Sequence, residues 1–237
     1  MNMEQVTDIT KWDTIAYNYS NAMNNNHFSY IEQTWLSTIG DVENKAVLDL
    51  GSGEGSITHE IKKLGAEITG IDGSGKFVEI ASSNFPDINF IEYDLSVGLP
   101  PLKSHFDLII SHMTLMDIHT LDKLFLDVHS NLNDDGYFIF SILHPCFFNQ
   151  KSFQDEETLE WYKKVTGYLT PEIWEIKSYG GHNHYHRSLS NYFNELKNAN
   201  LSVVELLEPP HLSKSTTIAE KFAKDFPLIL IIKAKKI

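Results

Sequence analysis

The segment Val47-Leu48-Asp49-Leu50-Gly51-Ser52-Gly53-Glu54-Gly55 decides the fold of this 237-residue chain. The short apolar run from Ala46 to Leu50 enters a turn with glycine at alternate positions, and Ile57, Ile61 and Leu64 then follow at helical spacing. Glycine has no Cβ, so the backbone can turn sharply after a strand and lie close to a ligand. The segment therefore predicts a strand, a glycine turn and a helix.

The same order of strand, turn and helix recurs along the chain. Apolar runs predict strands at 67–71, 89–93, 106–110, 137–142, 201–207 and 227–234. Helical spacing predicts one or two helices within 1–40 and further helices at 77–83, 121–131, from 189 to 196, and at 215–224. Strands that alternate with helices favour an α/β fold with a parallel sheet and helices on both faces.

Composition narrows the classes of partner. Lys and Arg total 19 against 32 for Asp and Glu, a formal net charge of -13, and this balance opposes binding to a polyanion, so we expect no nucleic-acid partner. The apolar run 228–232 is much shorter than the ~20 residues of a membrane-spanning helix, so we expect no membrane association. The first ten residues are polar and Cys146 has no second cysteine to pair with, so we expect a cytoplasmic protein.

The turn has the spacing Asp-x-Gly-x-Gly-x-Gly, which differs from the dinucleotide fingerprint G-x-G-x-x-G. It resembles the first motif of class I S-adenosylmethionine-dependent methyltransferases, of the small-molecule kind similar to methyltransferase types 11 and 25. The resemblance covers residues 45 to 142, where four further motifs follow in the family's order: Ile71-Asp72, Tyr93-Asp94-Leu95, Phe106 to Ser111 and Leu132 to Phe138.

The resemblance implies S-adenosyl-L-methionine as the cofactor and a Rossmann-like, seven-stranded, mostly parallel sheet whose last strand is antiparallel. In the family, an acidic residue such as Asp72 accepts hydrogen bonds from ribose hydroxyls, Asp94 and Leu95 contact adenine, and Asp49 lies near the methionine part. From the residues alone, an aspartate at a strand end can instead cap a helix. The expected cofactor-binding residues are Tyr19, Asp49, Gly51, Ser52, Gly53, Asp72, Gly73, Asp94, Leu95 and Ser111.

We expect a single methyltransferase domain over 1–237, since no linker, repeat or low-complexity tract divides the chain. Its expected parts are an N-terminal helical cap at 1–40, a cofactor-binding core at 45–144, an inserted aromatic-rich cap at 145–187 and the rest of the sheet at 188–237. Aromatic side chains of the inserted cap exclude water and suit a closed acceptor pocket, although most of them can simply form the core of the cap.

The acceptor is expected to be a small molecule, with the methylated atom left open among oxygen, nitrogen and carbon. Histidine suits a general base near neutral pH, and His144 and His186 lie in segments that resemble the small-molecule enzymes. His182, His184 and His186 alternate and so share one side of an extended strand, but without a cysteine nearby we expect no metal site.

Two other classes of function stay open from the sequence. A nicotinamide-dependent oxidoreductase uses a similar sheet and also an acidic residue after its second strand. A non-catalytic module that keeps the cofactor pocket, or only the fold, is also open, because the motifs do not prove a competent acceptor site. The sequence does not indicate an oligomeric state.

Overall fold

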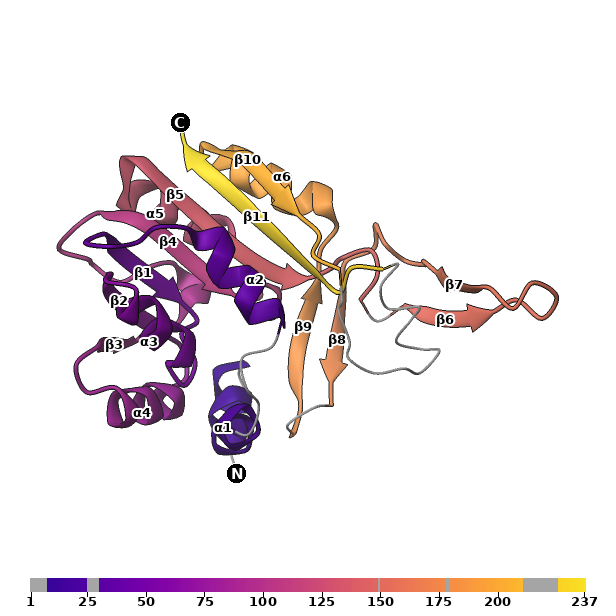
Figure 1. Ribbon diagram of the computed structural model, residues 1–237, viewed down its shortest axis with the longest axis horizontal. Coiled ribbons are helices and arrows are strands. Elements are labelled where there is room, and N and C mark those ends of the chain that lie inside the picture. Colours follow the sequence, from indigo (N-terminus) through magenta and orange to yellow (C-terminus); the bar gives the residue numbers. More distant parts are fainter. Residues whose placement is uncertain (1–7, 25–29, 149, 178–179, 211–225) are drawn as a thin grey trace, which may run out of the picture.

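A seven-stranded sheet forms the centre of the computed structural model, which describes residues 8–24, 30–148, 150–177, 180–210 and 226–237 (Figure 1). The strands lie in the order β10-β11-β5-β4-β1-β2-β3. Their bounds are β1 Ala46–Leu50, β2 Glu67–Asp72, β3 Asn89–Glu92, β4 Phe106–His112, β5 Leu132–Leu143, β10 Leu201–Leu207 and β11 Ile229–Lys236. Only β11 runs antiparallel to its neighbours, so the predicted fold class is confirmed, with the closing strand between β5 and β10.

Helices cover both faces of this sheet. They are α1 Asp8–Asn24, α2 Tyr30–Ile39, α3 Ser56–Lys63, α4 Gly75–Asn84, α5 Asp122–Asn131 and α6 Leu189–Asn198, with short 3-10 turns η1 Leu95–Val97 and η2 Leu115–Asp117. One apolar cluster joins Leu48 to α5 and α6, and a second joins Val47 to α2 and α3. Neighbouring residues of β1 thus face opposite layers, which explains why this central strand is apolar almost throughout.

Two parts of the chain differ from the sequence expectations. Strand β5 begins at Leu132, directly after α5, instead of at 137, and its register against β4 shifts between Phe106 and Leu108. The inserted segment contains four strands that periodicity did not predict: β6 Lys151–Gln154, β7 Trp161–Lys164, β8 Glu172–Ile176 and β9 His182–His186. Strands β6, β7 and β8 are short and have exposed or half-buried side chains, so they lack the apolar alternation on which such predictions depend; β9 is mostly buried, but its residues are mostly polar. The helix expected at 215–224 lies outside the described residues.

The four inserted strands form two hairpins with different surroundings. Strands β8 and β9 pair antiparallel, and β9 contacts both α1 and η2 at the carboxyl end of the sheet. Strands β6 and β7 form a sheet of their own that projects away from the body of the molecule (Figure 1). Within the described ranges, no helix is long and apolar enough to cross a membrane.

Candidate cofactor and acceptor site

The glycine turn after β1 has one packed and one open position. Gly51 and Gly53 have positive φ angles of 75° and 54°, which disfavour residues with a side chain. A Cβ added at Gly51 would lie 2.2 Å from Thr114 Cγ2, whereas one added at Gly53 would meet nothing within 4 Å. Gly51 is therefore required by internal packing, and Gly53 faces open space that a ligand can occupy.

Two hydroxyl groups from the end of β4 hold this turn in place. Ser111 Oγ donates to the carbonyl of Leu50 at 2.9 Å, and Thr114 Oγ1 donates to the carbonyl of Gly51 at 3.3 Å. Ser111, one of the expected cofactor residues, is fully buried, and its hydroxyl stabilises the turn through this bond to the backbone. Ser52 is also buried, and its Oγ has no hydrogen-bond partner among the described residues.

Asp72 ends β2 beside the turn. Its Oδ2 accepts a hydrogen bond from Gly53 N at 2.8 Å and its Oδ1 accepts one from Ser74 N at 2.8 Å. Burial, together with the charges of Glu54 and Asp13, raises the pKa of Asp72 to about 6, although the two backbone hydrogen bonds oppose this rise. The carboxylate is thus fixed in orientation next to the open position at Gly53.

Asp49 is 2% exposed at the end of β1 and accepts a hydrogen bond from Thr58 Oγ1 of α3 at 2.7 Å. Burial raises its pKa to about 7; the Thr58 hydrogen bond opposes this, and the charges of Asp72 and Glu54 add to it. The carboxyl groups of Asp49, Asp72 and Glu54 therefore lie close together, with little positive charge nearby to compensate them. Such a region favours a cation or a donor-rich ligand.

The end of β3 has the geometry of a helix cap. Asp94 is the N-cap of η1, and its Oδ1 accepts a hydrogen bond from Ser96 N at 2.8 Å. Leu95 is buried in the apolar core. The backbone of Tyr93 donates to the carbonyl of Asp72 at 2.9 Å, which brings this turn beside the one after β2. Asp94 thus caps a turn at the same edge of the sheet as Asp72.

Helix α1 lies over the turn after β2. Ile9 Cγ1 would be 3.2 Å from a Cβ at Gly73, so the helix closes off that glycine. Trp12 and Tyr19 pack against Phe77 of α4, with ring centroids 6.2 Å and 5.6 Å from it. Tyr19 thereby reaches the first turn of the helix that follows Asp72.

The contacts that connect these parts were not predicted from the sequence. Asp13 of α1 accepts hydrogen bonds from Ser74 Oγ at 2.6 Å and from Lys76 N at 3.2 Å. Ser74 is the N-cap of α4, and its Oγ also accepts from Phe77 N. A serine just before a helical run is a signal that could have identified this cap. The pairing of Asp13 with Ser74 and that of Thr114 with Gly51 had no comparable signal, since the partners are more than 60 residues apart.

The segment after β4 lies at the centre of the carboxyl edge. His112 Nδ1 lies 2.8 Å from Ser141 Oγ, and that oxygen also accepts a hydrogen bond from Met113 N at 3.1 Å. Burial lowers the pKa of His112 to about 4 and keeps its ring neutral. Met113 has a positive φ of 56°, an uncommon conformation for a residue with a side chain.

His144, one of the two candidate bases, is 1% exposed at the end of β5. Its Nε2 lies 2.8 Å from Glu208 Oε1, and its Nδ1 accepts a hydrogen bond from Cys146 N at 3.2 Å. The second contact leaves Nε2 as the protonated nitrogen that donates to the carboxylate. Both nitrogens are thus engaged within the protein.

The alternation of His182, His184 and His186 is confirmed: all three are buried on one side of β9. The indole of Trp174 stacks on His184 and His186, with ring centroids 5.1 Å and 4.7 Å apart. The ring centroids of Trp12 of α1 and His182 are 4.5 Å apart. Each histidine has an Nδ1 without a hydrogen-bond partner in the described part of the chain. We refer to this set of imidazole and indole rings as the β9 ring row.

The rings of the β9 ring row differ in their surroundings. Burial, reinforced by His186, His182 and Arg187, lowers the pKa of His184 to about 3, and burial with Lys11 also lowers that of His182. His186 Nε2 donates to the carbonyl of Tyr168 at 2.9 Å, which leaves its Nδ1 as a free acceptor. Among the described residues, no group of three metal-ligating side chains is arranged to hold a metal ion.

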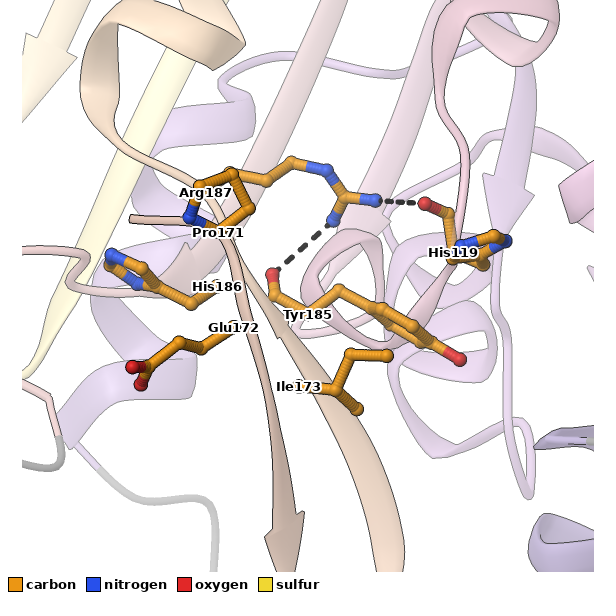
Figure 2. Close-up of a pocket in the computed structure, with 7 residues that line it drawn as sticks. All are labelled: His119, Pro171, Glu172, Ile173, Tyr185, His186 and Arg187. Carbon is orange, nitrogen blue, oxygen red and sulfur yellow. Dashed lines mark hydrogen bonds between the residues drawn. The ribbon is translucent and has the colours of Figure 1, made fainter. Parts of the chain in front are cut away.

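A pocket of about 330 Å³ lies where the β8–β9 hairpin meets the loop after β4 (Figure 2). Arg187 donates to the carbonyls of His119 at 2.6 Å and Tyr185 at 3.4 Å across it, and also to that of Ile118 at 2.5 Å. This arginine thus binds backbone carbonyls and ties the hairpin to the loop. His186 is the one predicted site residue in the lining of this pocket.

These features together define a cofactor-binding fold of the class I methyltransferase type. They are the sheet with a single antiparallel strand, the glycine turn, and the carboxylates at the ends of β1, β2 and β3. Residues 41–191 match the family model described as a methyltransferase domain, and the chain belongs to this family. The chain is therefore an S-adenosylmethionine-dependent methyltransferase. This membership decides against the nicotinamide-dependent oxidoreductase.

Similar proteins extend the match over most of the chain. An uncharacterized protein from Haemophilus influenzae is 27% identical over 224 residues, 86% of each chain. A crystal structure of an S-adenosylmethionine-dependent methyltransferase from Mesorhizobium loti has a TM-score of 0.73 at 24% identity and covers 86% of this chain and 96% of that one. The glycopeptide N-methyltransferase MtfA, solved with S-adenosyl-L-methionine, has a TM-score of 0.63 at 15% identity, with coverage of 90% and 96%. Other curated relatives, all described as methyltransferases, match over 32 to 56% of their own length.

The residues of the site fit this cofactor. The open position at Gly53, the oriented carboxylate of Asp72 and the unpartnered hydroxyl of Ser52 offer space, an acceptor for hydroxyl groups and a polar contact. The carboxyl groups around Asp49 suit a ligand that carries a sulfonium and an ammonium group.

Proposed function

We propose that this methyltransferase modifies a small molecule in the cytoplasm. One observation carries the proposal: Trp12 contacts both Phe77 beside the cofactor turn and His182 of the β9 ring row. The row therefore begins next to the cofactor-binding elements and continues along β9 to the pocket that His186 lines. Its histidines are 9%, 4% and 3% exposed, so an acceptor that reaches them has to fit an enclosed space.

The cofactor supplies a methyl group activated by its sulfonium. In the proposal, Asp72 accepts hydrogen bonds from the ribose, Asp94 and Leu95 border the adenine, and Asp49 balances the positive charge of the methionine part. The other expected cofactor residues, Tyr19, Gly51, Ser52, Gly53, Gly73 and Ser111, form or cover the turn. Holding the reactants in a near-attack geometry can supply roughly 7 to 11 kcal/mol of the barrier.

An oxygen or nitrogen acceptor loses a proton as it is methylated, and His186 and His144 remain our candidates to take it. The geometry ranks His186 first, because its Nδ1 is a free, buried acceptor. His144 has both nitrogens engaged, so it accepts a proton only if its contact with Glu208 or Cys146 opens. The indole of Trp174, stacked on His186, excludes water from this side of the ring.

The net charge of -13 favours a small acceptor over a nucleic acid. The test is methyl transfer from cofactor labelled in its methyl group to a cell extract separated by size. We expect the label in the low-molecular-mass fraction, and none with the Asp72→Ala variant. Label mainly in protein or nucleic acid would contradict the small-molecule proposal. Cofactor binding without transfer to any fraction would favour a non-catalytic module.

A further inference from the structure

The projecting β6–β7 hairpin has an exposed face with a regular order of charges and rings. Both strands are four residues long, and every residue of β6 is exposed. A two-stranded hairpin by itself is marginally stable in water. Two cross-strand pairs, Lys151 with Lys164 and Phe153 with Tyr162, share one face of this hairpin. Two residues further along, at the start of the turn, Asp155 lies opposite Glu160.

The central pair of this face is aromatic. The rings of Phe153 and Tyr162 stack at 5.6 Å with an interplanar angle of 19°, and the two residues are 38% and 47% exposed. Stacked rings present a flat apolar surface, which gains free energy when a second ring surface covers it. The hairpin therefore offers a small apolar contact in its middle.

The two outer pairs carry like charges. Lys151 and Lys164 are directly opposed on the side toward the body, and such cross-strand pairs are destabilising unless an opposite charge is supplied. Asp155 and Glu160 are joined by a hydrogen bond from Asp155 N to Glu160 O at 2.8 Å on the side toward the tip. Hydrogen bonds from Thr158 N and Glu157 N lower the pKa of Asp155, so its carboxylate stays charged.

We propose that this face binds the same face of a second copy of the chain and forms a dimer with twofold symmetry. A twofold axis along the line from Phe153 to Tyr162 reverses the strand direction in the second copy. The charged pairs lie about 7 Å on either side of this axis, at two residues of strand rise. Each lysine of one copy thus meets a carboxylate of the other, Lys151 with Asp155 and Lys164 with Glu160, and the aromatic pairs stack.

The charge pattern favours a second copy over an acidic partner of another kind. An acidic molecule would be attracted to Lys151 and Lys164 but repelled by Asp155 and Glu160 about 14 Å further along the same face. The net charge of -13 adds to that repulsion. Only an occupant with the opposite order of charges satisfies both ends, and this chain has that order when turned around.

Sedimentation velocity of the full chain over a concentration series tests the dimer. We expect a reversible dimer that weakens as salt is added, because exposed ion pairs are screened. Lys164→Glu and Glu160→Lys should each raise the dissociation constant by about tenfold or more, since each change acts twice across the axis. The double variant, and an equal mixture of the two single variants, should recover the dimer because opposite charges face each other again.

A matched control and a functional control accompany these variants. Lys45→Glu changes the net charge by the same amount as Lys164→Glu, at an exposed position away from the hairpin, and should leave the dimer intact. All variants should bind S-adenosylhomocysteine as the wild type does, which shows that they are folded. A chain that stays monomeric throughout, or a dimer that neither single reversal weakens, would overturn the proposal. So would a monomer that binds a polyanion such as heparin through this hairpin.

Discussion

The carboxylate of Asp13 lies 2.6 Å from the hydroxyl of Ser74, and this contact joins the first helix to the cofactor turn. The backbone of Ser74 donates to Asp72 at 2.8 Å, and Asp72 in turn accepts from Gly53 at 2.8 Å. One chain of hydrogen bonds thus runs from α1 to the glycine turn. Docking of α1 and the orientation of the Asp72 carboxylate are therefore expected to depend on each other.

Removing the first link should weaken cofactor binding. Asp13→Ala deletes a charged acceptor of two hydrogen bonds, each worth about 1.5 to 3 kcal/mol, and we expect about tenfold weaker binding of S-adenosylhomocysteine. Amide hydrogen exchange should become faster in α1. Asn18→Ala, at an exposed position on the same helix, is the control and should change neither measurement. Unchanged exchange and affinity in Asp13→Ala would show that α1 is held by other contacts.

The two glycines of the turn should respond differently to the same substitution. Gly51→Ala places a Cβ 2.2 Å from Thr114, so it should lower the thermal stability or prevent folding. Gly53→Ala meets open space and should fold, with a cost of about 1 to 2 kcal/mol for its left-handed backbone. It should nevertheless lose most cofactor affinity, because the methyl group occupies the space for the ligand. A stable Gly53→Ala protein with wild-type affinity would place the cofactor elsewhere.

Asp49 should make the cofactor-free protein less stable as the pH rises. Its pKa is about 7 in the folded state against an ordinary value of 3.8, so the folded state binds more protons between these values. The free energy of unfolding therefore falls as pH rises through this window, and the loss is complete above it. Asp49→Asn should be more stable than the wild type at about pH 8, by roughly 2 to 4 kcal/mol, and similar at about pH 4. Urea unfolding at both pH values measures the difference in the free energy of unfolding between the variant and the wild type. Equal free energies at about pH 8 would mean that ionisation of the Asp49 carboxyl does not destabilise the folded state.

The candidate bases should separate turnover from cofactor binding. His186→Ala and His144→Ala are both expected to lower turnover of the acceptor identified by methyl labelling, with little change in affinity for S-adenosylhomocysteine. His144→Ala should also lower the stability by about 1 to 3 kcal/mol, because it leaves Glu208 and the Cys146 amide without their partner. Full activity in both variants would exclude both histidines as the base.

Much of the cofactor half could be predicted because its signals are local. The turn at Gly51 to Gly55 and the strand ending at Asp72 are written in consecutive residues, and the structure has both. The alternation on β9 also predicted correctly that its three histidines share a face. At Asp94 the resemblance suggested a ligand and the residues alone suggested a cap; the structure shows the cap, and the ligand role remains a prediction.

The rest depends on contacts between distant segments. Asp13 and Ser74 are 61 positions apart, and neither residue signals the other. His144 was expected as a candidate base, but its contact with Glu208, 64 positions later, was not predicted. The β6–β7 hairpin escaped prediction because its strands are only four residues long and largely exposed, so no apolar period distinguishes them from a loop.

Calorimetric titration with S-adenosylhomocysteine tests the central claim, that the turns after β1 and β2 bind the cofactor. Wild type and Asp72→Asn are compared, with Asp135→Asn, at a 97% exposed side chain, as the matched control and NAD as the competing ligand. We predict that the wild type and the control bind S-adenosylhomocysteine but not NAD. The affinity of Asp72→Asn for S-adenosylhomocysteine should be lower by about tenfold or more. Equal affinity in a folded Asp72→Asn protein, or binding of NAD alone, would contradict the account.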